Sequence, residues 1–189
     1  MTTRLIGLSG SLRTDSFNTA LLKAAATSMP EGAELSIASI RGIPLYDGDV
    51  EAEHGVPPQV GALKDAIAAA DGLLLVTPEY NNGMPGVFKN AIDWLSRPAA
   101  DIPRVFGGRP IAVIGASPGG FGTILAQNAW LPVLRTLGTN PWFGGRLQVS
   151  RAGTVFGPDG AIVDARIAGL LRDFMAGFAR FAAEAPRSR

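Results

Sequence analysis

The sequence predicts an α/β fold built on a parallel sheet with helices on both faces, and two observations support this prediction. Short apolar runs of strand length alternate along the chain with longer segments whose apolar residues recur at helical spacing. This alternation is typical of successive strand–helix–strand units. In addition, the segments that follow three of the apolar runs are rich in Gly, Ser, Pro and Asn. In such sheets, ligands bind beyond the carboxyl ends of the strands.

Five strands are predicted from the apolar runs. They cover residues 5–8, 35–40, 73–77 and 111–116, with a less regular fifth strand over residues 142–149. Turn-forming residues bound each run, and the runs are too short for helices that would cover a sheet. Because parallel neighbours need a crossover connection, a helix is expected between each strand and the next.

The predicted helices each present one apolar stripe to the sheet. Four stripes are visible: Phe17, Leu21, Leu22 and Ala25; Val60, Leu63, Ile67 and Ala70; Val87, Phe88, Ala91, Ile92 and Leu95; and, in a long closing helix, Ile167, Leu170, Leu171, Phe174, Met175, Phe178 and Phe181. Five strands and five helices in strict alternation favour a flavodoxin-like three-layer sandwich, with a five-stranded parallel sheet of order 2-1-3-4-5.

Length and composition favour one domain. With 189 residues and 47% hydrophobic content, the chain is expected to form a single domain over residues 1–185, followed by a tail at residues 186–189. Residues 98–110 contain three prolines and are predicted to form a surface loop. The chain has no cysteine, which excludes disulfides, a thiol nucleophile and cysteine-ligated metal. Redox chemistry would therefore require a bound cofactor.

Charge and hydropathy argue against nucleic-acid and membrane partners. The net charge of +1 provides no long-range field for nucleic acid, and the basic residues are dispersed. The first apolar run is interrupted by Gly7 and Ser9, well short of a signal-peptide core, and no segment approaches the roughly 20 apolar residues of a membrane span. A cytoplasmic location is expected.

The loop after the first strand is the strongest candidate for an anion site. It offers the hydroxyls of Ser11 and Ser16, the amide of Asn18 and the cation of Arg13, directly before a predicted helix. A helix N-terminus presents unpaired N–H groups and a partial positive charge, which together suit a phosphate. The alternative is that Ser16 only caps the helix and Arg13 is solvated. The loop matches neither the Gly-Lys-Ser/Thr of nucleotide triphosphatases nor the dinucleotide glycine spacing, so a mononucleotide phosphate fits best.

The loop after the third strand, residues 77–86, contains Pro78, Glu79, Tyr80 and Asn81, and Pro85 is placed to begin the next helix. Rigid turn residues can hold backbone N–H and C=O groups in fixed directions, as the polar edge of an isoalloxazine ring requires. The alternative is an ordinary tight turn with Tyr80 as a surface aromatic.

The loop after the fourth strand imitates a hydrolase nucleophile elbow, because Ser117 lies within Gly-x-Ser-x-Gly. Two residues count against a hydrolase. The only histidine, His54, precedes the serine, and Pro118 has no N–H for an oxyanion hole. The glycines of this loop instead suit close approach to a flat ring. The acidic segment around His54 does not match a calcium loop, because Ala52 replaces the required glycine, and a solvated loop is expected there.

Four motifs together resemble one family. They are Gly-Ser-Leu-Arg at residues 10–13 with Ser16 and Asn18, Pro-Glu-Tyr-Asn at 78–81 with Pro85-Gly86, Lys-Asn-Ala-Ile-Asp-Trp-Leu-Ser-Arg at 89–97, and Ser-Pro-Gly-Gly at 117–120. On these residues the chain resembles the NADPH-dependent FMN reductase family, which includes bacterial quinone and chromate reductases and is related to flavin-dependent azoreductases. Two residues depart from the family pattern: Gly83 stands where many members have serine, and Phe88 where leucine is usual.

The resemblance implies a non-covalently bound FMN and a specific set of contacts. Its phosphate would lie against Ser11, Arg13, Ser16 and Asn18. Its ring would lie along Pro78, Glu79, Tyr80 and Asn81, with Ser117, Gly119 and Gly120 beside the other edge. The resemblance also implies a homodimer or homotetramer.

The activity implied is that of an NAD(P)H-dependent oxidoreductase with no catalytic side chain, the chemistry taking place at N5 of the flavin. NADPH or NADH would reduce the flavin, and a small acceptor such as a quinone, free flavin, chromate, an azo dye or a nitro compound would reoxidise it on the same face in a ping-pong scheme. Two alternatives remain open. One is an FMN-binding electron carrier for protein partners, against which the near-neutral charge argues, and the other is a regulatory module without FMN.

Overall fold

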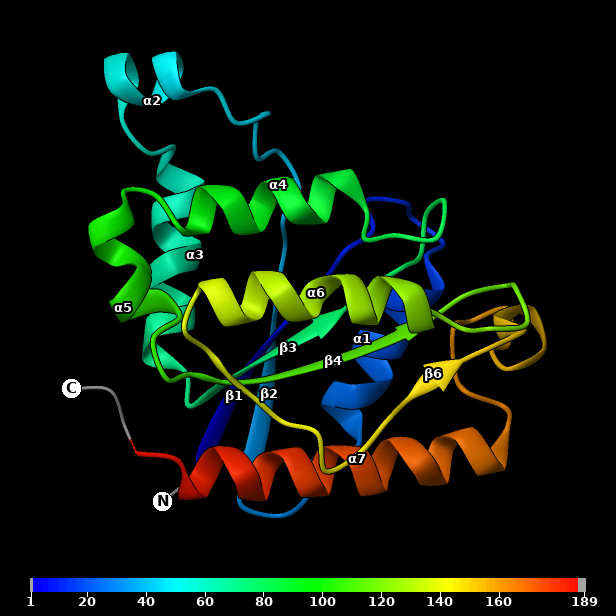
Figure 1. Cartoon of the computed structure of the whole chain (residues 1–189). Helices are drawn as coiled ribbons and strands as arrows, with labels where there is room; N and C mark the ends of the chain where they lie inside the picture. Colours follow the sequence, from blue (N-terminus) through cyan, green and yellow to red (C-terminus); the bar gives the residue numbers. More distant parts are fainter. Residues whose placement is uncertain (1, 187–189) are drawn as a thin grey trace.

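A parallel sheet forms the centre of the molecule in this computed structural model, which describes residues 2–186. Its strands are β1 (Thr3–Ser9), β2 (Ala33–Ala38), β3 (Gly72–Val76), β4 (Pro110–Ala116), β5 (Asn140–Pro141) and β6 (Gln148–Val149). The order is β2-β1-β3-β4-β5, and β6 also pairs with β4 (Figure 1). The predicted order 2-1-3-4-5 is confirmed. All five residues of β3 are buried, as expected of a strand covered on both faces.

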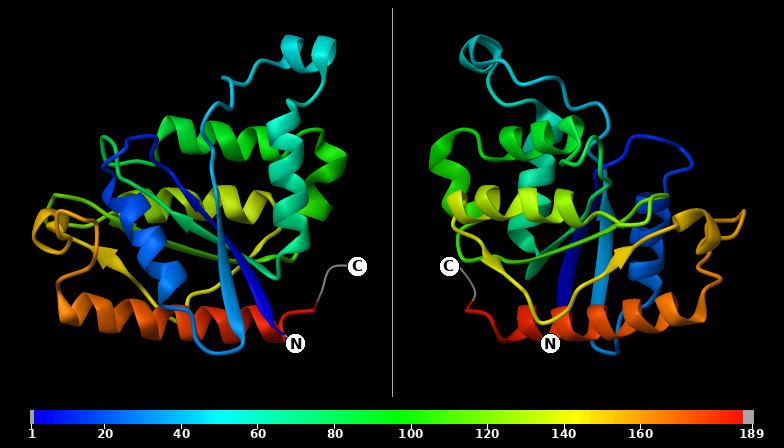
Figure 2. Two further views of the ribbon diagram at one scale, coloured as in Figure 1. Left: turned by 180° about the vertical axis from the view of Figure 1, so that it is seen from behind. Right: turned by 45° about the vertical axis from the view of Figure 1, so that its right-hand side comes forward.

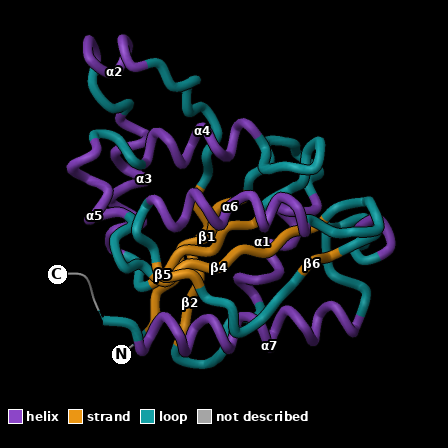
Figure 3. The backbone as a smooth tube through the Cα atoms, viewed as in Figure 1, coloured by secondary structure: helices purple, strands orange, loops and turns teal. Residues whose placement is uncertain are grey.

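Helices cover both faces of the sheet and make it the middle of three layers (Figure 3). On one face lie α1 (Phe17–Thr27) and α7 (Ala165–Glu184), and on the other lie α3 (Pro58–Ala69), α4 (Gly86–Leu95) and α6 (Ile124–Thr136). The predicted apolar stripes form two hydrophobic clusters against the sheet. Val87 and Leu170 are exceptions, since they are 39% and 41% exposed and lie at the solvent side of their helices.

The predicted fifth strand over residues 142–149 is wrong for most of its length. In this part of the chain only the short strands β5 and β6 pair with β4, and between them the chain turns toward α7 (Figure 1). The reason is Trp142, whose ring packs against Phe174 and Phe178 of α7, with ring centroids 4.8 Å and 5.9 Å away. Burying this large ring on the helix outweighs a few more ladder hydrogen bonds.

The surface loop predicted at residues 98–110 is also wrong in part. It contains a short 3₁₀ turn (Ala99–Asp101) and the helix α5 (Ile102–Val105), with Val105 and Phe106 buried. Buried Arg109 closes this segment by donating hydrogen bonds to the carbonyls of Val105 (2.5 Å), Arg104 (3.1 Å) and Ala70. One guanidinium thus serves the C-terminal ends of both α5 and α3, and burial lowers its pKa.

Between β2 and α3, residues 39–57 form an arm whose tip, with the helix α2, projects from the rest of the molecule (Figure 2). The segment around His54, expected to be a loop, contains the short helix α2 (Gly48–His54), capped by the Asp47 side chain, and all but one of its residues are exposed. Just beyond the end of α4, Arg97 Nε donates a hydrogen bond of 2.8 Å to Glu51 and so holds the arm. The Arg97 hydrogen bond lowers the pKa of the Glu51 carboxyl.

Of the predicted tail, residues 187–189 lie outside the described residues. No helix within residues 2–186 is both long and apolar enough to cross a membrane. In the same range, no three Asp, Glu or His side chains are grouped so that they could hold a metal ion.

Candidate functional site

The three loops singled out in the sequence meet at the carboxyl edge of the sheet. They follow β1, β3 and β4, three strands that are neighbours in the order β1-β3-β4. A small hollow of about 60 Å³ lies among them. Its lining brings together eight of the predicted site residues: Ser11, Arg13, Ser16, Asn18, Pro78, Glu79, Tyr80 and Ser117. Asn81, Gly119 and Gly120 lie farther along the same loops and do not line it.

The first loop ends in a helix N-terminus that is only partly capped. The Ser16 hydroxyl accepts hydrogen bonds from the backbone N–H groups of Asn18 (3.2 Å) and Thr19 (3.4 Å), so Ser16 is the N-cap of α1. Within residues 2–186, the backbone N–H groups of Ser16 and Phe17 have no hydrogen-bond partner. The Ser16 hydroxyl still has its own proton to donate, so capping the helix and binding an anion are compatible.

Arg13 supplies the positive charge at this end of the site. Its side chain is exposed and forms no ion pair with any residue that the structure describes. The loop that carries it is ordered by local bonds: Ser11 donates its N–H to the Ser9 hydroxyl (3.4 Å), and Arg13 donates its N–H to the Ser11 hydroxyl (3.3 Å). A cation without a protein partner beside a helix N-terminus fits a phosphate.

Gly10 is fixed by a close approach that allows no side chain. A Cβ at this position would lie 2.2 Å from Cδ1 of Phe88, which is fully buried in α4. The ring of Phe88 packs edge-to-face against Trp130 of α6, with centroids 5.1 Å apart. Phe88, one of the two departures from the family pattern, therefore supports the first loop from below. The other, Gly83, has only Tyr80 O near its open side, at 3.8 Å, and does not line the hollow.

Asn18 joins the first loop to the third. Its buried side-chain amide donates to the carbonyl of Ala116 (2.8 Å) and accepts the N–H of the same residue (2.9 Å). The amide thereby continues the ladder of hydrogen bonds past the end of β3. The sequence predicted Asn18 as a phosphate ligand, and in the structure two of its polar groups are already used to hold β4.

The second loop is a rigid turn, as predicted. Tyr80 and Gly83 exchange two backbone hydrogen bonds of 3.0 Å, and Asn81 and Asn82 between them have φ of 50° and 61°. Asparagine tolerates this left-handed conformation better than other residues with a side chain. The Glu79 carboxylate points to α6, where it accepts the N–H groups of Leu125 and Ala126 at 2.9 Å and 3.0 Å.

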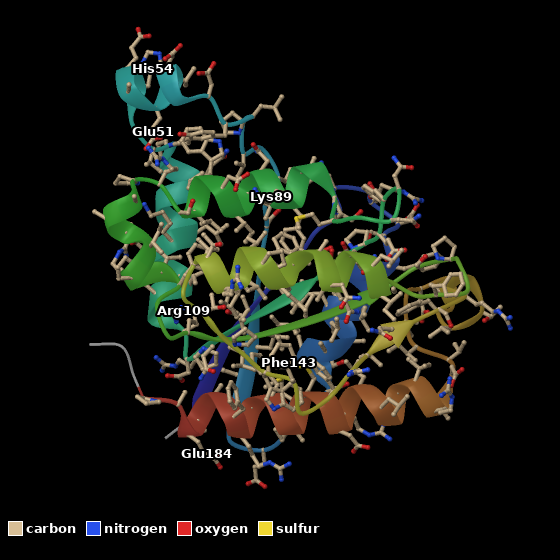
Figure 4. All side chains as sticks on the ribbon, in the orientation of Figure 1. Glu51, His54, Lys89, Arg109, Phe143 and Glu184 are labelled. Atoms are coloured by element: carbon tan, nitrogen blue, oxygen red, sulfur yellow. The ribbon has the colours of Figure 1, made fainter. Side chains whose placement is uncertain are left out.

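The third loop is held from the side of β6. Ser117 donates its N–H to Val149 O (2.9 Å) and accepts the N–H of Ala152 (3.0 Å), while the Ser117 hydroxyl accepts the N–H of Gly119 (3.1 Å). His54 lies on the distant arm, where Figure 4 labels it. The hydrolase alternative therefore lacks both a base for Ser117 and an oxyanion N–H at Pro118.

Sequence reasoning missed the contacts that hold these loops from below. Trp130 Nε1 of α6 donates to Oγ1 of buried Thr77 (3.1 Å), and the Thr77 hydroxyl donates to Pro78 O (2.9 Å). A Cβ at Gly115 would lie 2.2 Å from Thr77 O. No pattern in the sequence signals these contacts, because they join residues 53 and 38 positions apart.

The residues present fit a mononucleotide with a flat polar ring. A partly open helix N-terminus beside the Arg13 cation suits the phosphate, and the two other loops that border the hollow are rigid. Neither a nucleophile with its base nor a metal cluster is found in the described part of the chain.

Comparisons with known proteins agree with this reading. The family model for NADPH-dependent FMN reductase matches residues 3–154. An NAD(P)H-dependent FMN reductase of Pseudomonas aeruginosa is 44% identical over 161 residues, 85% of each chain. A quinone reductase of Escherichia coli is 44% identical over 125 residues, which cover 66% of this chain and 65% of that protein. The structure of the flavoenzyme NAD(P)H:(acceptor) oxidoreductase FerB of Paracoccus denitrificans has a TM-score of 0.86 and 33% identity, covering 97% of this chain and 99% of that one.

Proposed function

The chain belongs to the NADPH-dependent FMN reductase family, and on this premise we propose that the hollow at the carboxyl edge of the sheet is its FMN site. The chain is an oxidoreductase that uses FMN and takes electrons from NAD(P)H. The observation that carries the assignment of the site is the N-terminus of α1, where unpaired N–H groups and the unpaired cation of Arg13 border one hollow.

Each loop has a distinct task in this proposal. Ser11, Arg13 and Ser16 bind the phosphate, and Asn18 fixes the end of β4 beside it. The backbone of residues 78–81 lies along the ring, with Tyr80, which is 47% exposed, at the border of the site. Ser117, Gly119 and Gly120 lie beside the other edge of the ring, where the missing side chains of the two glycines permit close approach.

Catalysis in this site rests on positioning. When bound, FMN supplies the redox chemistry by accepting a hydride from NAD(P)H and passing its electrons to the acceptor. The protein holds the reactants at roughly 3 to 3.5 Å, and backbone dipoles of the second and third loops stabilise negative charge at the polar ring edge. No side chain of the site is needed as nucleophile or general base. We propose that donor and acceptor use one open face in turn, which predicts parallel lines in initial-rate plots.

The phosphate assignment is tested by comparing FMN with riboflavin, which has the same ring and no phosphate. Arg13→Ala should weaken FMN binding about tenfold, the lower end for a charge-assisted hydrogen bond because the side chain is exposed, and should leave riboflavin binding unchanged. Arg172→Ala removes an exposed cation from α7 and serves as the matched control. Equal losses for both ligands, or no loss for FMN, would contradict the assignment.

The activity is tested with NADPH and NADH against quinones, free flavin, chromate, azo dyes and nitro compounds. Turnover with the purified yellow protein is the expected result. A yellow protein without turnover would indicate an electron carrier instead, and a colourless protein that binds no added FMN would indicate a regulatory module. Intersecting initial-rate lines would refute the single shared face.

We further propose that the chain forms a homodimer or homotetramer in the cytoplasm. Large apolar side chains remain exposed in the third loop, on α6 and between β5 and β6, among them Phe121 (82%), Leu131 (39%) and Phe143 (70%). Such exposure favours an interface. The lack of cysteine is compatible with a reducing compartment. Sedimentation equilibrium of the FMN-loaded protein measures the oligomeric state, and a monomer at micromolar concentration would contradict the proposal.

A further inference from the structure

Glu79 belongs to the second loop, residues 77–86, but its carboxylate is bound to the helix α6. A single oxygen, Oε2, accepts the N–H groups of Leu125 (2.9 Å) and Ala126 (3.0 Å) in the first turn of α6. These partners are 46 and 47 residues away in the sequence. A carboxylate that accepts two backbone N–H groups is a strong, charge-assisted helix cap.

Among the described residues, Glu79 provides the only side-chain cap of the N-terminus of α6. Thr123 occupies the N-cap position and makes no side-chain capping bond. Its buried hydroxyl instead accepts a hydrogen bond from Gln127 Nε2 (3.0 Å). Glu79 therefore performs from a different loop the task that an N-cap residue ordinarily performs from within the helix.

The negative charge of Glu79 faces the positive end of a helix dipole. Of the helices that begin at the carboxyl side of the sheet, α1, α4 and α6 follow β1, β3 and β4, and each directs the positive end of its dipole toward the three loops. The positive end of α1 is capped by the neutral Ser16, and Pro85 at the start of α4 makes no side-chain cap bond. Within residues 2–186, α6 is the one of these three helices that receives a carboxylate, while α7 is capped by its own N-cap residue, Asp164. The negative charge of Glu79 in the second loop thus lies against the positive end of α6 and partly neutralises it.

The chain on both sides of Glu79 is constrained as well, by a contact with α6 before it and by a tight turn after it. Pro78, which precedes it, is buried, and its carbonyl accepts a hydrogen bond from the Thr77 hydroxyl. That hydroxyl in turn accepts a hydrogen bond from Trp130 Nε1 in the middle of α6. After Glu79 the chain enters the tight turn from Tyr80 to Gly83. Glu79 is therefore the last attachment of this loop to the framework before its exposed tip.

We propose that Glu79 is a positioning residue that acts on FMN through α6, an inference that rests on the function proposed above. The Glu79 side chain is long enough to reach α6, and this attachment holds the backbone of residues 78–81 in the orientation that the ring requires. The charge of Glu79 cancels the positive end of α6. The helix therefore adds nothing to the stabilisation of reduced, anionic flavin, which comes from the loops alone. Glu79 does not bind the ring by its side chain.

Two substitutions separate the length of the side chain from its charge. Glu79→Asp keeps the charge and shortens the side chain by one methylene, which prevents a single oxygen from reaching both N–H groups. Glu79→Gln keeps the length and an acceptor oxygen and removes the charge. Glu184→Gln is the matched control: it removes one exposed carboxylate near the end of α7 (Figure 4), at the opposite end of the sheet from the loops.

The experiment titrates FMN into apo-protein and then measures the midpoint potential of the bound flavin relative to free FMN. We expect Glu79→Asp to weaken binding of oxidised FMN about tenfold without changing the potential. We expect Glu79→Gln to keep that affinity within about threefold of wild type and to favour reduced over oxidised FMN about threefold, because the end of α6 is no longer neutralised. Glu184→Gln should match wild type in both measurements.

Two results would overturn the inference while leaving the proposed function intact. If Glu79→Gln loses affinity as severely as Glu79→Asp, the carboxylate acts on the flavin itself rather than on α6. If the potential of Glu79→Gln equals that of wild type, the charge of Glu79 is not felt at the ring. Wild-type protein that binds no FMN would refute the proposed function, and the inference with it.

Discussion

Replacing Gly10 by alanine should destabilise the apo-protein strongly, because the space above Gly10 is occupied by Phe88. The new Cβ would lie 2.2 Å from Phe88 Cδ1, 2.8 Å from Cγ and 2.9 Å from Cε1. Neither partner can move easily: the Gly10 N–H is bonded to Val76 O (2.9 Å), and the ring of Phe88 is fully buried against Trp130. Relief therefore requires a shift of about 1 Å in a packed core.

Overpacking of this kind costs about 1 to 3 kcal/mol, and the depth of this overlap places Gly10→Ala near the upper value. At about 2 to 4 °C per kcal/mol for a chain of this length, the melting temperature should fall by roughly 6 to 12 °C. Phe88→Leu alone should cost about 1 to 2 kcal/mol. In the double variant the shorter, branched side chain can turn away from the alanine, so the two losses should be less than additive by about 2 kcal/mol.

Urea unfolding of the four proteins in this cycle measures the coupling directly. Gly61→Ala is the control, because a Cβ at this position in the first turn of α3 meets nothing within 4 Å. It should stabilise the protein by up to about 0.5 to 1 kcal/mol. Additive losses for Gly10→Ala and Phe88→Leu would show that the two residues do not share this space and would refute the packing argument.

Three further predictions concern the framework and the arm. Asn18→Ala should cost about 2 to 3 kcal/mol in urea unfolding, because it leaves the buried N–H and C=O of Ala116 without partners; a loss below 0.5 kcal/mol, on the order of a surface substitution, would contradict this. Arg109→Met should cost about 2 to 4 kcal/mol, since three carbonyls lose their donor, and Arg109→Lys should recover little of it. The pKa of Glu51 is lowered by Arg97 from its ordinary value of 4.5, so this pair stabilises the folded protein above about pH 4.5 and the stabilisation is lost as pH falls through the folded-state pKa. Glu51→Gln should flatten the acid side of the stability profile, and an unchanged slope there would refute the assignment.

The sheet was predictable because its signal is local and redundant. Residues 73–76 are an apolar run between turn residues, and the structure buries every one of them in β3. The strand order followed from alternation of the elements rather than from any single contact. The fifth strand failed because the decisive partner of Trp142 is α7, more than 30 residues later in the chain. A strand pattern in a local window cannot report that competition between pairing with β4 and packing on a helix.

The location of the candidate site was predictable in the same way, while the roles of its side chains were not. Residue types placed Glu79 and Asn18 in the right loops. The bonds they make, to α6 and to β4, depend on which backbone groups of distant elements lack partners. Arg109 gave no signal for a similar reason, because nothing in the sequence shows that two helices end beside it.

A substitution at Ser16 can distinguish a helix cap from a phosphate ligand in the first loop. A negative side chain at this position favours the cap of α1 and disfavours a bound phosphate. Aspartate is as good an N-cap as serine, and its negative charge at the N-terminus of α1 is favourable to the helix. Ser16→Asp should therefore keep or slightly raise the free energy of unfolding. The same carboxylate would repel a phosphate from a hollow that Ser16 lines, so FMN binding should weaken by tenfold or more, on the order of one charge-assisted hydrogen bond, while riboflavin binding should change little. If FMN binds Ser16→Asp as it binds wild type, Ser16 is a helix cap only and the phosphate lies elsewhere.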